Sequence, residues 1–284
     1  GEKVQLYLAD MGVKGAGSSH KIGVGEPLGQ FYGYISDGLY QVSDFNYDKA
    51  SGKYTLKDGI PYRGEKDKVQ PGMLKFKNID GSEDNKITED DKTVIGNAFP
   101  KFYGGINNTF TYKDFDLSIF LTYSFGNDVL NATKLTNTRT ALTNKNVLAA
   151  ADWNHRWVTI NKETGALITD PEELAAANQG KTIACFDDNG SSDNAVIHSW
   201  AVEDGSYLKL SNITLGYTFP KKIVNKIGLS KLRLYATGNN LLTWTKYTGY
   251  DPEVSTMSNA MTPGVDFGAY PRSRSFVFGV NVAF

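Results

Sequence analysis

The sequence predicts an all-β fold in which antiparallel strands form part of a transmembrane β-barrel. Three observations lead to this prediction: apolar side chains alternate with polar or small ones, the patterned runs are long enough to cross a bilayer, and short connections alternate with very long ones. The clearest run is residues 275–284, where Phe or Val occupies every second position and the last residue is Phe284. Since about 9 to 11 tilted residues cross a bilayer, this run suffices for one strand.

Other strands are expected from the same periodicity. In residues 115–126, the side chains of Leu117, Ile119 and Leu121 lie on one face of a strand, and Ser118 lies on the other. In a barrel, the apolar face contacts lipid and the opposite face lines the lumen. The remaining strands are expected at residues 30–41, 103–112, 207–219, 232–242 and 272–284.

The connections between these strands differ greatly in length. Only Lys113 and Asp114 separate two of them, which is the length of a hairpin turn. Residues 220–230 form a second short connection, in which one turn of helix is expected to end at Gly228. Outer-membrane barrels combine short periplasmic turns with long extracellular loops. We therefore expect long extracellular loops at residues 42–100, 127–206 and 244–271.

The composition agrees with a barrel and narrows the possible partners. The 284 residues are 40% hydrophobic and contain no apolar run of 18 residues, which excludes membrane-spanning helices. The net charge of −1 gives no general basic surface, so no nucleic-acid partner is expected. The single Cys185 cannot form an internal disulfide, which is compatible with an oxidising compartment. The chain opens at Gly1 without a signal segment, and we interpret it as a fragment or a mature cleavage product.

Several short motifs, in order along residues 24–284, together resemble the C-terminal part of SusC/RagA-type TonB-linked (TonB-dependent) outer-membrane proteins. No single motif is specific, but the ordered set is. The motifs are VGEP at 24–27, FYGY at 31–34, DGLY at 37–40, YLKLSNITLGY at 207–217, NNLLT at 239–243, YTGYDPE at 247–253 and YPR at 270–272.

The resemblance implies the C-terminal portion of a large barrel of about 22 strands with an N-terminal plug. Such a protein imports glycans or peptides across the outer membrane of a Gram-negative bacterium with energy from TonB, and it works with a SusD-like lipoprotein. Six or seven of the strands are expected in this chain, and the plug and the N-terminal strands are expected to be absent. The TonB complex would then act through the missing N-terminal part. The resemblance also implies that Phe284 is the signal for outer-membrane assembly, and no enzyme activity is expected.

One acidic loop has the spacing of an EF-hand calcium site. Calcium requires six to eight oxygen ligands, which this spacing can bring together in one turning loop. Asn85 replaces the usual Gly of the sharp turn, and two ligand positions also depart from the usual residues. A weak structural Ca²⁺ site is expected, and the alternative is a solvated acidic turn. The candidate ligands are Asp80, Ser82, Asp84, the Lys86 carbonyl and Asp91.

Candidate substrate-binding residues are Trp153 and Trp157, which flank three polar residues in a long loop. Exposed aromatic rings beside polar groups can stack on sugar rings, whereas the alternative is a loop anchored by its own aromatic side chains. No Ser or Cys has a recognisable nucleophile context, and the three His residues lack metal-ligand spacing, so no catalytic residues are expected.

Two other classes of protein remain as alternatives. A soluble, calcium-dependent glycan-binding β-sandwich would also show alternating strands and aromatic loops, although its strands would be shorter. A barrel with an embedded hydrolase would need a catalytic constellation in its loops. Detergent dependence separates the sandwich from the barrel, because only the barrel requires detergent to stay in solution.

Overall fold

A computed structural model describes residues 5–10, 18–138, 146–184, 196–256 and 260–284, which fall into two compact units. Cys185 lies outside the described residues. None of the helices in the described part of the chain is long and apolar enough to cross a membrane. Unit 1 comprises Gly1–Ala98, Leu130–Val202 and Thr256–Gly268, and unit 2 comprises Phe99–Val129, Glu203–Ser255 and Ala269–Phe284.

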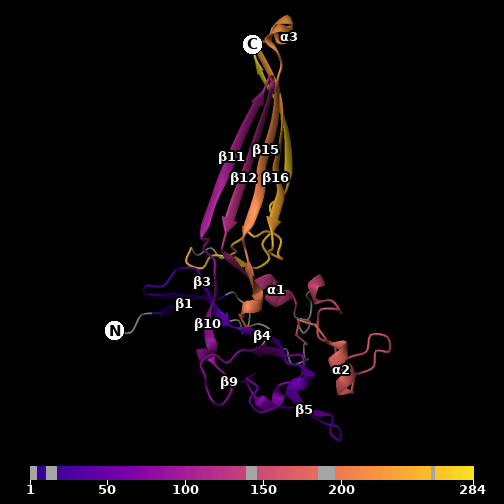
Figure 1. The fold of residues 1–284 in the computed structure, drawn as a ribbon. Coiled ribbons are helices and arrows are strands. Elements are labelled where there is room, and N and C mark those ends of the chain that lie inside the picture. The colour runs from indigo at the N-terminus through magenta and orange to yellow at the C-terminus, as the bar shows by residue number, and fades with distance from the viewer. Residues whose placement is uncertain (1–4, 11–17, 139–145, 185–195, 257–259) are drawn as a thin grey trace. The chain divides into compact units, whose positions relative to one another are not determined.

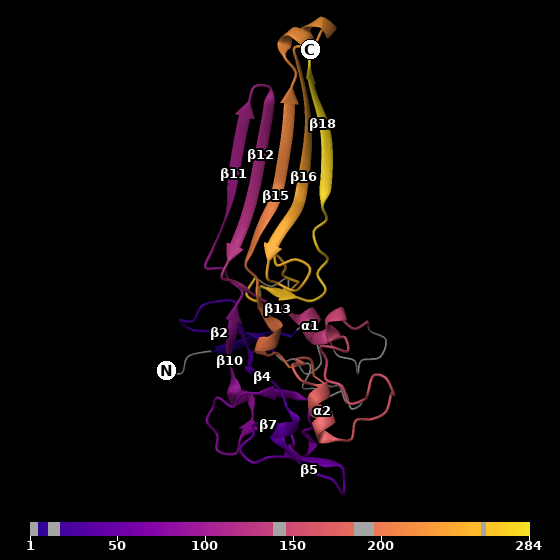
Figure 2. The ribbon, with the colours of Figure 1, turned by 45° about the vertical axis from the view of Figure 1, so that its right-hand side comes forward.

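Unit 2 is built on one antiparallel sheet of five long strands (Figure 1). In the sheet, β11 and β18 are the two edge strands, as Figure 2 shows. The predicted strands in this part of the chain are confirmed, with ends that differ by at most three residues. The strands, in their order across the sheet, are β11 (Phe102–Tyr112), β12 (Phe115–Phe125), β15 (Tyr207–Thr218), β16 (Lys231–Thr245) and β18 (Ser275–Ala283).

The short connections lie at the same end of the sheet as the C-terminus (Figure 1). Lys113 closes the turn between β11 and β12 with a φ of 54°, in the left-handed region. Between β15 and β16 the chain forms α3 (Lys221–Val224) and a 3-10 turn. Gly228 ends this segment with a φ of 75°, as the sequence predicts, because glycine adopts this conformation without a steric penalty.

A pair of irregularities changes the register of the sheet near the long-loop ends of its strands. Ser211 is an extra residue in β15, since the pairing with β12 shifts between Phe120 and Leu121. On the other neighbour of β15, Asn240 in β16 has a φ of 52°, which asparagine tolerates better than most residues. The Asn240 amide donates to the Ser273 carbonyl at 3.2 Å. This bulge explains why an asparagine suits position 240 of the NNLLT motif.

The alternation along the strands separates the two faces of the sheet. One row across all five strands consists of Phe110, Leu117, Leu215, Ala236 and Phe278. This face stays exposed: Phe278 is 80% and Leu215 is 51% accessible in the described structure. Aromatic side chains border it at both ends, as in the girdles of membrane barrels. They are Phe102, Phe125 and Trp244 at the long-loop end, and Tyr112, Phe115 and Tyr217 at the turn end.

On the opposite, polar face, an ion pair joins β12 to β16 across a glycine of β15. Arg233 donates to the Asp116 carboxylate through Nε at 3.0 Å and Nη2 at 2.5 Å. The pair crosses over Gly216 of the intervening β15, and a Cβ atom at Gly216 would collide with both side chains. The glycine of the TLGY sequence therefore leaves room for this close approach.

Unit 1 contains the N-terminal elements and most of the long segments. A four-stranded sheet has the order β1–β2–β3–β10, and β4 pairs with β8, β5 with β6, β7 with β9 and β13 with β17. Elements β13 (Asp128–Asn131) and β14 (Val202–Asp204) run across the unit boundaries. The other bounds are β1 (Gln5–Asp10), β2 (Ser18–Gly23), β3 (Gln30–Tyr34), β4 (Ser36–Leu39), β5 (Phe45–Asp48), β6 (Lys53–Leu56), β7 (Tyr62–Arg63), β8 (Leu74–Phe76), β9 (Lys86–Ile87), β10 (Lys92–Asn97), α1 (Ala132–Asn137), α2 (Pro171–Ala177) and β17 (Val265–Asp266).

The strand expected at residues 30–41 differs from the prediction. It is divided into β3 and β4, and β3 pairs with β2 and β10 in unit 1 rather than joining the five-stranded sheet. The division follows from a contact with a distant segment, because the Tyr34 amide donates to the Ile197 carbonyl at 3.1 Å. Gly33 permits this approach, since a Cβ there would collide with the same carbonyl. The barrel-type sheet therefore has five strands in the described structure, not the six or seven expected.

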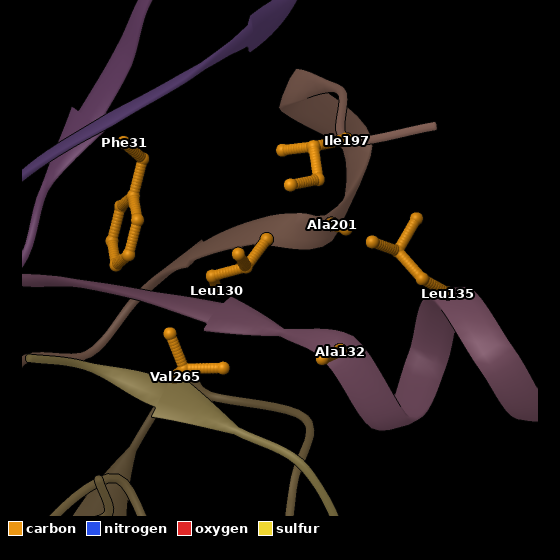
Figure 3. Packing of buried hydrophobic residues seen from close by; sticks show 7 residues of the cluster. All are labelled: Phe31, Leu130, Ala132, Leu135, Ile197, Ala201 and Val265. Atoms are coloured by element: carbon orange, nitrogen blue, oxygen red, sulfur yellow. The ribbon is translucent and has the colours of Figure 1, made fainter. Parts of the chain in front are cut away.

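The long segments build hydrophobic cores of their own. The cluster in Figure 3 brings together three separate stretches of chain, around Phe31, Leu130–Leu135 and Ile197–Ala201, with Val265 added from a fourth. A second cluster surrounds Trp157. These contacts join residues far apart in the sequence, and for that reason local periodicity did not reveal them.

We predict that Gly216→Ala destabilises the sheet by about 1 to 3 kcal/mol, because the added methyl group displaces the Asp116–Arg233 pair. The measurement is urea unfolding of the receptor refolded in detergent. In a background that carries both Asp116→Ala and Arg233→Ala, the same glycine substitution should have almost no cost. An equal cost in the two backgrounds would mean that the ion pair is not what requires the glycine.

Candidate functional site

The polar face of the sheet in unit 2 carries many small polar side chains, with the rings of Phe120 and Tyr235 among them. Hydrogen bonds between these side chains link each strand to its neighbour across the whole sheet. They join Ser118 to Asn107 at 3.3 Å, Thr122 to Ser211 at 2.6 Å, Thr214 to Thr237 at 2.8 Å, Asn212 to Asn239 at 2.7 Å and Asn239 to Ser275 at 3.1 Å. Such a surface suits contact with water or a polar solute, whereas the opposite face suits hydrocarbon.

A charged cluster lies where this polar face meets the long loop that follows β16. Lys209 of β15 is only 2% exposed, and its ammonium group donates to Glu253 at 2.8 Å and to Asp251 at 3.4 Å. Arg272, which precedes β18, lies 3.5 Å from the same Glu253 carboxylate. The cluster therefore ties three segments together: a strand, the loop after β16 and the approach to β18.

Hydrogen bonds within the loop and to Glu203 of β14 fix its shape. The Glu253 amide donates to Asp251 Oδ1 at 3.0 Å, which turns the chain at Pro252. Nearer the N-terminal end of the loop, the Thr248 hydroxyl and amide both donate to the Glu203 carboxylate, at 2.7 and 2.9 Å. The YTGYDPE motif is thus anchored at two places.

A hollow of about 370 Å³ lies beside the cluster. The charged side chains in its wall are Lys209, Asp251, Arg272 and Arg274, and the walls also include Asn240, Thr243, Tyr250 and Pro252. Thr243 pairs with Lys209 in the register of β15 and β16, so the hollow opens on the polar face. The volume falls within the range of small-molecule sites.

No pattern in the sequence singles out Lys209, Asp251, Glu253 or Arg272 as functional residues. Lys209 and the two carboxylates stand inside the motifs at 207–217 and 247–253, but their contacts join residues more than 40 positions apart. The signal that was available is the pair of carboxylates two residues apart, combined with a lysine inside a strand pattern.

The candidate calcium loop is arranged around Asp91, which is fully buried. Its carboxylate accepts the backbone amides of Ile79, Asp80 and Thr88, at 2.8, 3.3 and 2.8 Å. Asn85 has a φ of 54°, so it adopts the left-handed conformation that glycine supplies in an EF-hand.

Two other candidate ligands of the loop hold turns of the backbone. Asp80 accepts the Ser82 amide at 2.7 Å and Asp84 accepts the Lys86 amide at 3.0 Å. The Lys86 hydrogen bond holds the pKa of the exposed Asp84 carboxyl below its usual value. In the described part of the chain, no three His, Cys, Asp or Glu side chains gather as a metal site. The calcium site remains a prediction.

The two tryptophans lie in different surroundings. Trp157 is buried, at 3% exposure, and its ring lies close to Gly72, where an added Cβ would be 2.5 Å from ring atoms. Trp153 is partly exposed, with Arg156 at 5.6 Å and Lys181 at 6.0 Å from its ring centre. Burial, followed by the Arg156 charge, lowers the pKa of Lys181. Trp153 is the more exposed of the two residues, and substrate binding by either one stays a prediction.

Phe284 ends the chain beyond β18 and is 94% exposed. Its carbonyl accepts the Ser230 hydroxyl at 3.2 Å, and the Ser230 amide donates to the Ala283 carbonyl at 2.8 Å. The end of the chain is therefore hydrogen-bonded to the connection between β15 and β16. The position is compatible with an assembly signal, which stays a prediction.

The two faces of the sheet define the class of protein. A β-sandwich would cover the apolar face with a second sheet, but unit 2 has a single sheet among its described residues. Exposed apolar side chains between aromatic girdles, opposite a hydrogen-bonded polar face, are the features of an antiparallel transmembrane β-barrel. The predicted fold class is confirmed, and the described strands form an open section of the barrel wall.

Comparison with known proteins identifies the family. No family model matches the chain. The chain is 33% identical to TonB-dependent receptor P3 of Formosa agariphila over 92% of this chain and 22% of that protein. It is 26% identical to the TonB-dependent receptor SusC of Bacteroides thetaiotaomicron over 72% of this chain and 17% of that protein. The chain belongs to the SusC/RagA-type TonB-dependent receptors.

The fold agrees with solved structures of the same type. The structure of the RagAB peptide importer in its open-open state is similar, with a TM-score of 0.56 and 22% sequence identity. The match covers 99% of the present chain and 24% of the importer chain. A second structure of the RagAB peptide transporter gives a TM-score of 0.53. The chain thus spans about a quarter of the length of these proteins.

We predict that Lys209→Met destabilises the receptor by about 3 to 5 kcal/mol, because Asp251 keeps its charge in a buried position after its partner is lost. Urea unfolding in detergent measures this cost, and limited proteolysis within residues 246–256 should become faster. The matched control is Lys221→Met, at an exposed lysine of α3. Equal stability of the two variants would show that the buried cluster contributes little.

Proposed function

We propose that the chain is part of an outer-membrane importer that takes up nutrients, glycans or peptides, in a TonB-dependent manner. The observation that carries the proposal is the sheet of unit 2, which has one exposed apolar face between aromatic girdles and one hydrogen-bonded polar face. The apolar face contacts lipid in this proposal, and the polar face lines the lumen. The relatives support it, since they are named as receptors and a peptide importer.

The proposed location is the outer membrane of a Gram-negative bacterium. The proposed partners are a SusD-like lipoprotein and the TonB complex, the latter through a part of the receptor outside residues 1–284. The RagAB structures, which are described as a peptide transporter, support a two-component assembly of this type. The proposed role is transport rather than catalysis, in line with the names of the relatives.

Three site assignments belong to this proposal. Phe284 is the assembly signal at the end of the last strand. Trp153 contacts the substrate, whereas Trp157 supports the loop from within its core. A structural Ca²⁺ binds the loop of residues 80–91, and the left-handed Asn85 and the set of oxygen donors support this assignment. The ligands are Asp80, Ser82, Asp84, the Lys86 carbonyl and Asp91.

The experiment that tests the function is deletion of the gene in its host. Growth on one class of nutrient, either an oligosaccharide mixture or a peptide mixture, should be lost, while growth on free glucose and amino acids continues. The purified receptor should also carry a SusD-like lipoprotein with it. Unchanged growth on both mixtures, together with no lipoprotein in the purified material, would refute the proposal.

We expect Ile119→Arg to cost about 2 to 4 kcal/mol and Ser118→Arg much less, because only the first places a charge on the lipid face. Urea unfolding in detergent micelles measures both substitutions, which are one residue apart and differ only in face. Fractionation of cells should show less Ile119→Arg protein in the outer membrane, and the same assay on protein lacking Phe284 tests the assembly signal. Equal destabilisation at the two positions would contradict the assignment of faces.

Calcium should protect residues 42–100 from protease, with half-protection on the order of 10⁻⁴ to 10⁻³ M. The reason is that a bound ion would order a loop rich in exposed acidic side chains. The matched variant is Asp80→Ala combined with Asp84→Ala, which should abolish the protection. If calcium gives no protection, or protects this double variant equally, the loop is a solvated acidic turn.

A further inference from the structure

The hollow beside Lys209 carries an excess of positive charge. Three cationic side chains, Lys209, Arg272 and Arg274, line it, and Asp251 is the one carboxylate in its wall. Glu253 does not line the hollow, but it forms ion pairs with Lys209 and Arg272, which do. With both carboxylates counted, the hollow keeps one positive charge in excess.

The excess charge resides on the two arginines. Glu253 lies closer to Lys209, at 2.8 Å, than to Arg272, at 3.5 Å, and the Arg272 side chain is 58% exposed. Arg274 has no carboxylate within ion-pair distance among the residues that the structure describes. Both arginines line the hollow, and neither has its guanidinium charge fully matched by a carboxylate of the described residues. Lys209, in contrast, is buried and already bonded to two carboxylates.

The uncharged part of the wall suits a small organic group. Tyr250, which is 75% exposed, lines the hollow together with Pro252 and Pro271. Asn240 and Thr243 of β16 also belong to this part of the wall. A volume of about 370 Å³ admits one residue-sized group rather than a long oligomer.

We propose that this hollow binds a carboxylate group of the transported nutrient, held by the guanidinium groups of Arg274 and Arg272. This inference rests on the proposed function, because the hollow opens on the polar face that lines the lumen in that proposal. Arginine binds carboxylates with two parallel hydrogen bonds, which fix orientation as well as charge. Asp251 at the wall and the single excess charge favour a monoanion over a phosphate dianion.

The carboxylate has two chemical sources, the C-terminus of a peptide and the acid group of a uronic sugar. The test uses the receptor as its host makes it, purified in detergent at low salt, with calorimetric titration. The probes are triglycine against triglycinamide, and galacturonate against galactose. At least one acid should bind about tenfold tighter than its neutral counterpart, as expected for one charged hydrogen bond.

The variant Arg274→Gln should lower the affinity for that acid by about tenfold, and Lys246→Gln, an exposed lysine of the same loop that does not line the hollow, should leave it unchanged. The acid that binds identifies the source. Equal binding of acids and neutral counterparts, absence of binding, or full affinity in Arg274→Gln overturns the inference. Growth on the nutrient mixtures is scored separately, so a receptor that transports without this preference refutes only the carboxylate site.

Discussion

The structure of unit 2 depends on one constraint, which is that backbone amides and carbonyls in hydrocarbon must be paired within the protein. Each unmet group costs several kcal/mol, so strands in a bilayer must have neighbours on both sides. The inner strands β12, β15 and β16 meet this condition. The edge strands β11 and β18 have neighbours on one side only in the described structure, so in a closed barrel their outer edges pair with further strands.

With the backbone paired in this way, the side chains are free to specialise by face. Hydrogen bonds between Thr, Ser and Asn side chains link neighbouring strands on the polar face. Charged side chains add the Asp116–Arg233 pair near the turns and the Lys209 cluster near the long loops. The ion pair connects strands to one another, and the Lys209 cluster connects a loop to the sheet. Both charged groups therefore have a structural role.

The sequence predicted the part of the structure that is governed by local periodicity. Leu117, Ile119 and Leu121 reveal their face from spacing alone, and Gly228 marks the end of its helical turn from its own conformational freedom. The interior of unit 1 was not predictable in this way. Its cores join Phe31 to Leu130 and Val265, and such contacts leave no periodic signal in the short segments that supply them. The Lys209 cluster was missed for the same reason.

The extra residue at Ser211 divides β15 into two parts, and the apolar side chains alternate in a different register in each part. On the turn side of this position, odd-numbered residues such as Ile213 share the apolar face, whereas on the loop side Leu210 and Leu208 do. Without the shift, Lys209 would stand on the same side as Ile213 and point toward the acyl chains. In a strand with such a bulge, residues on one side of the bulge can be substituted without changing which face the residues on the other side occupy. Its loop-proximal end can therefore diversify for ligands while the bilayer-spanning end keeps its composition.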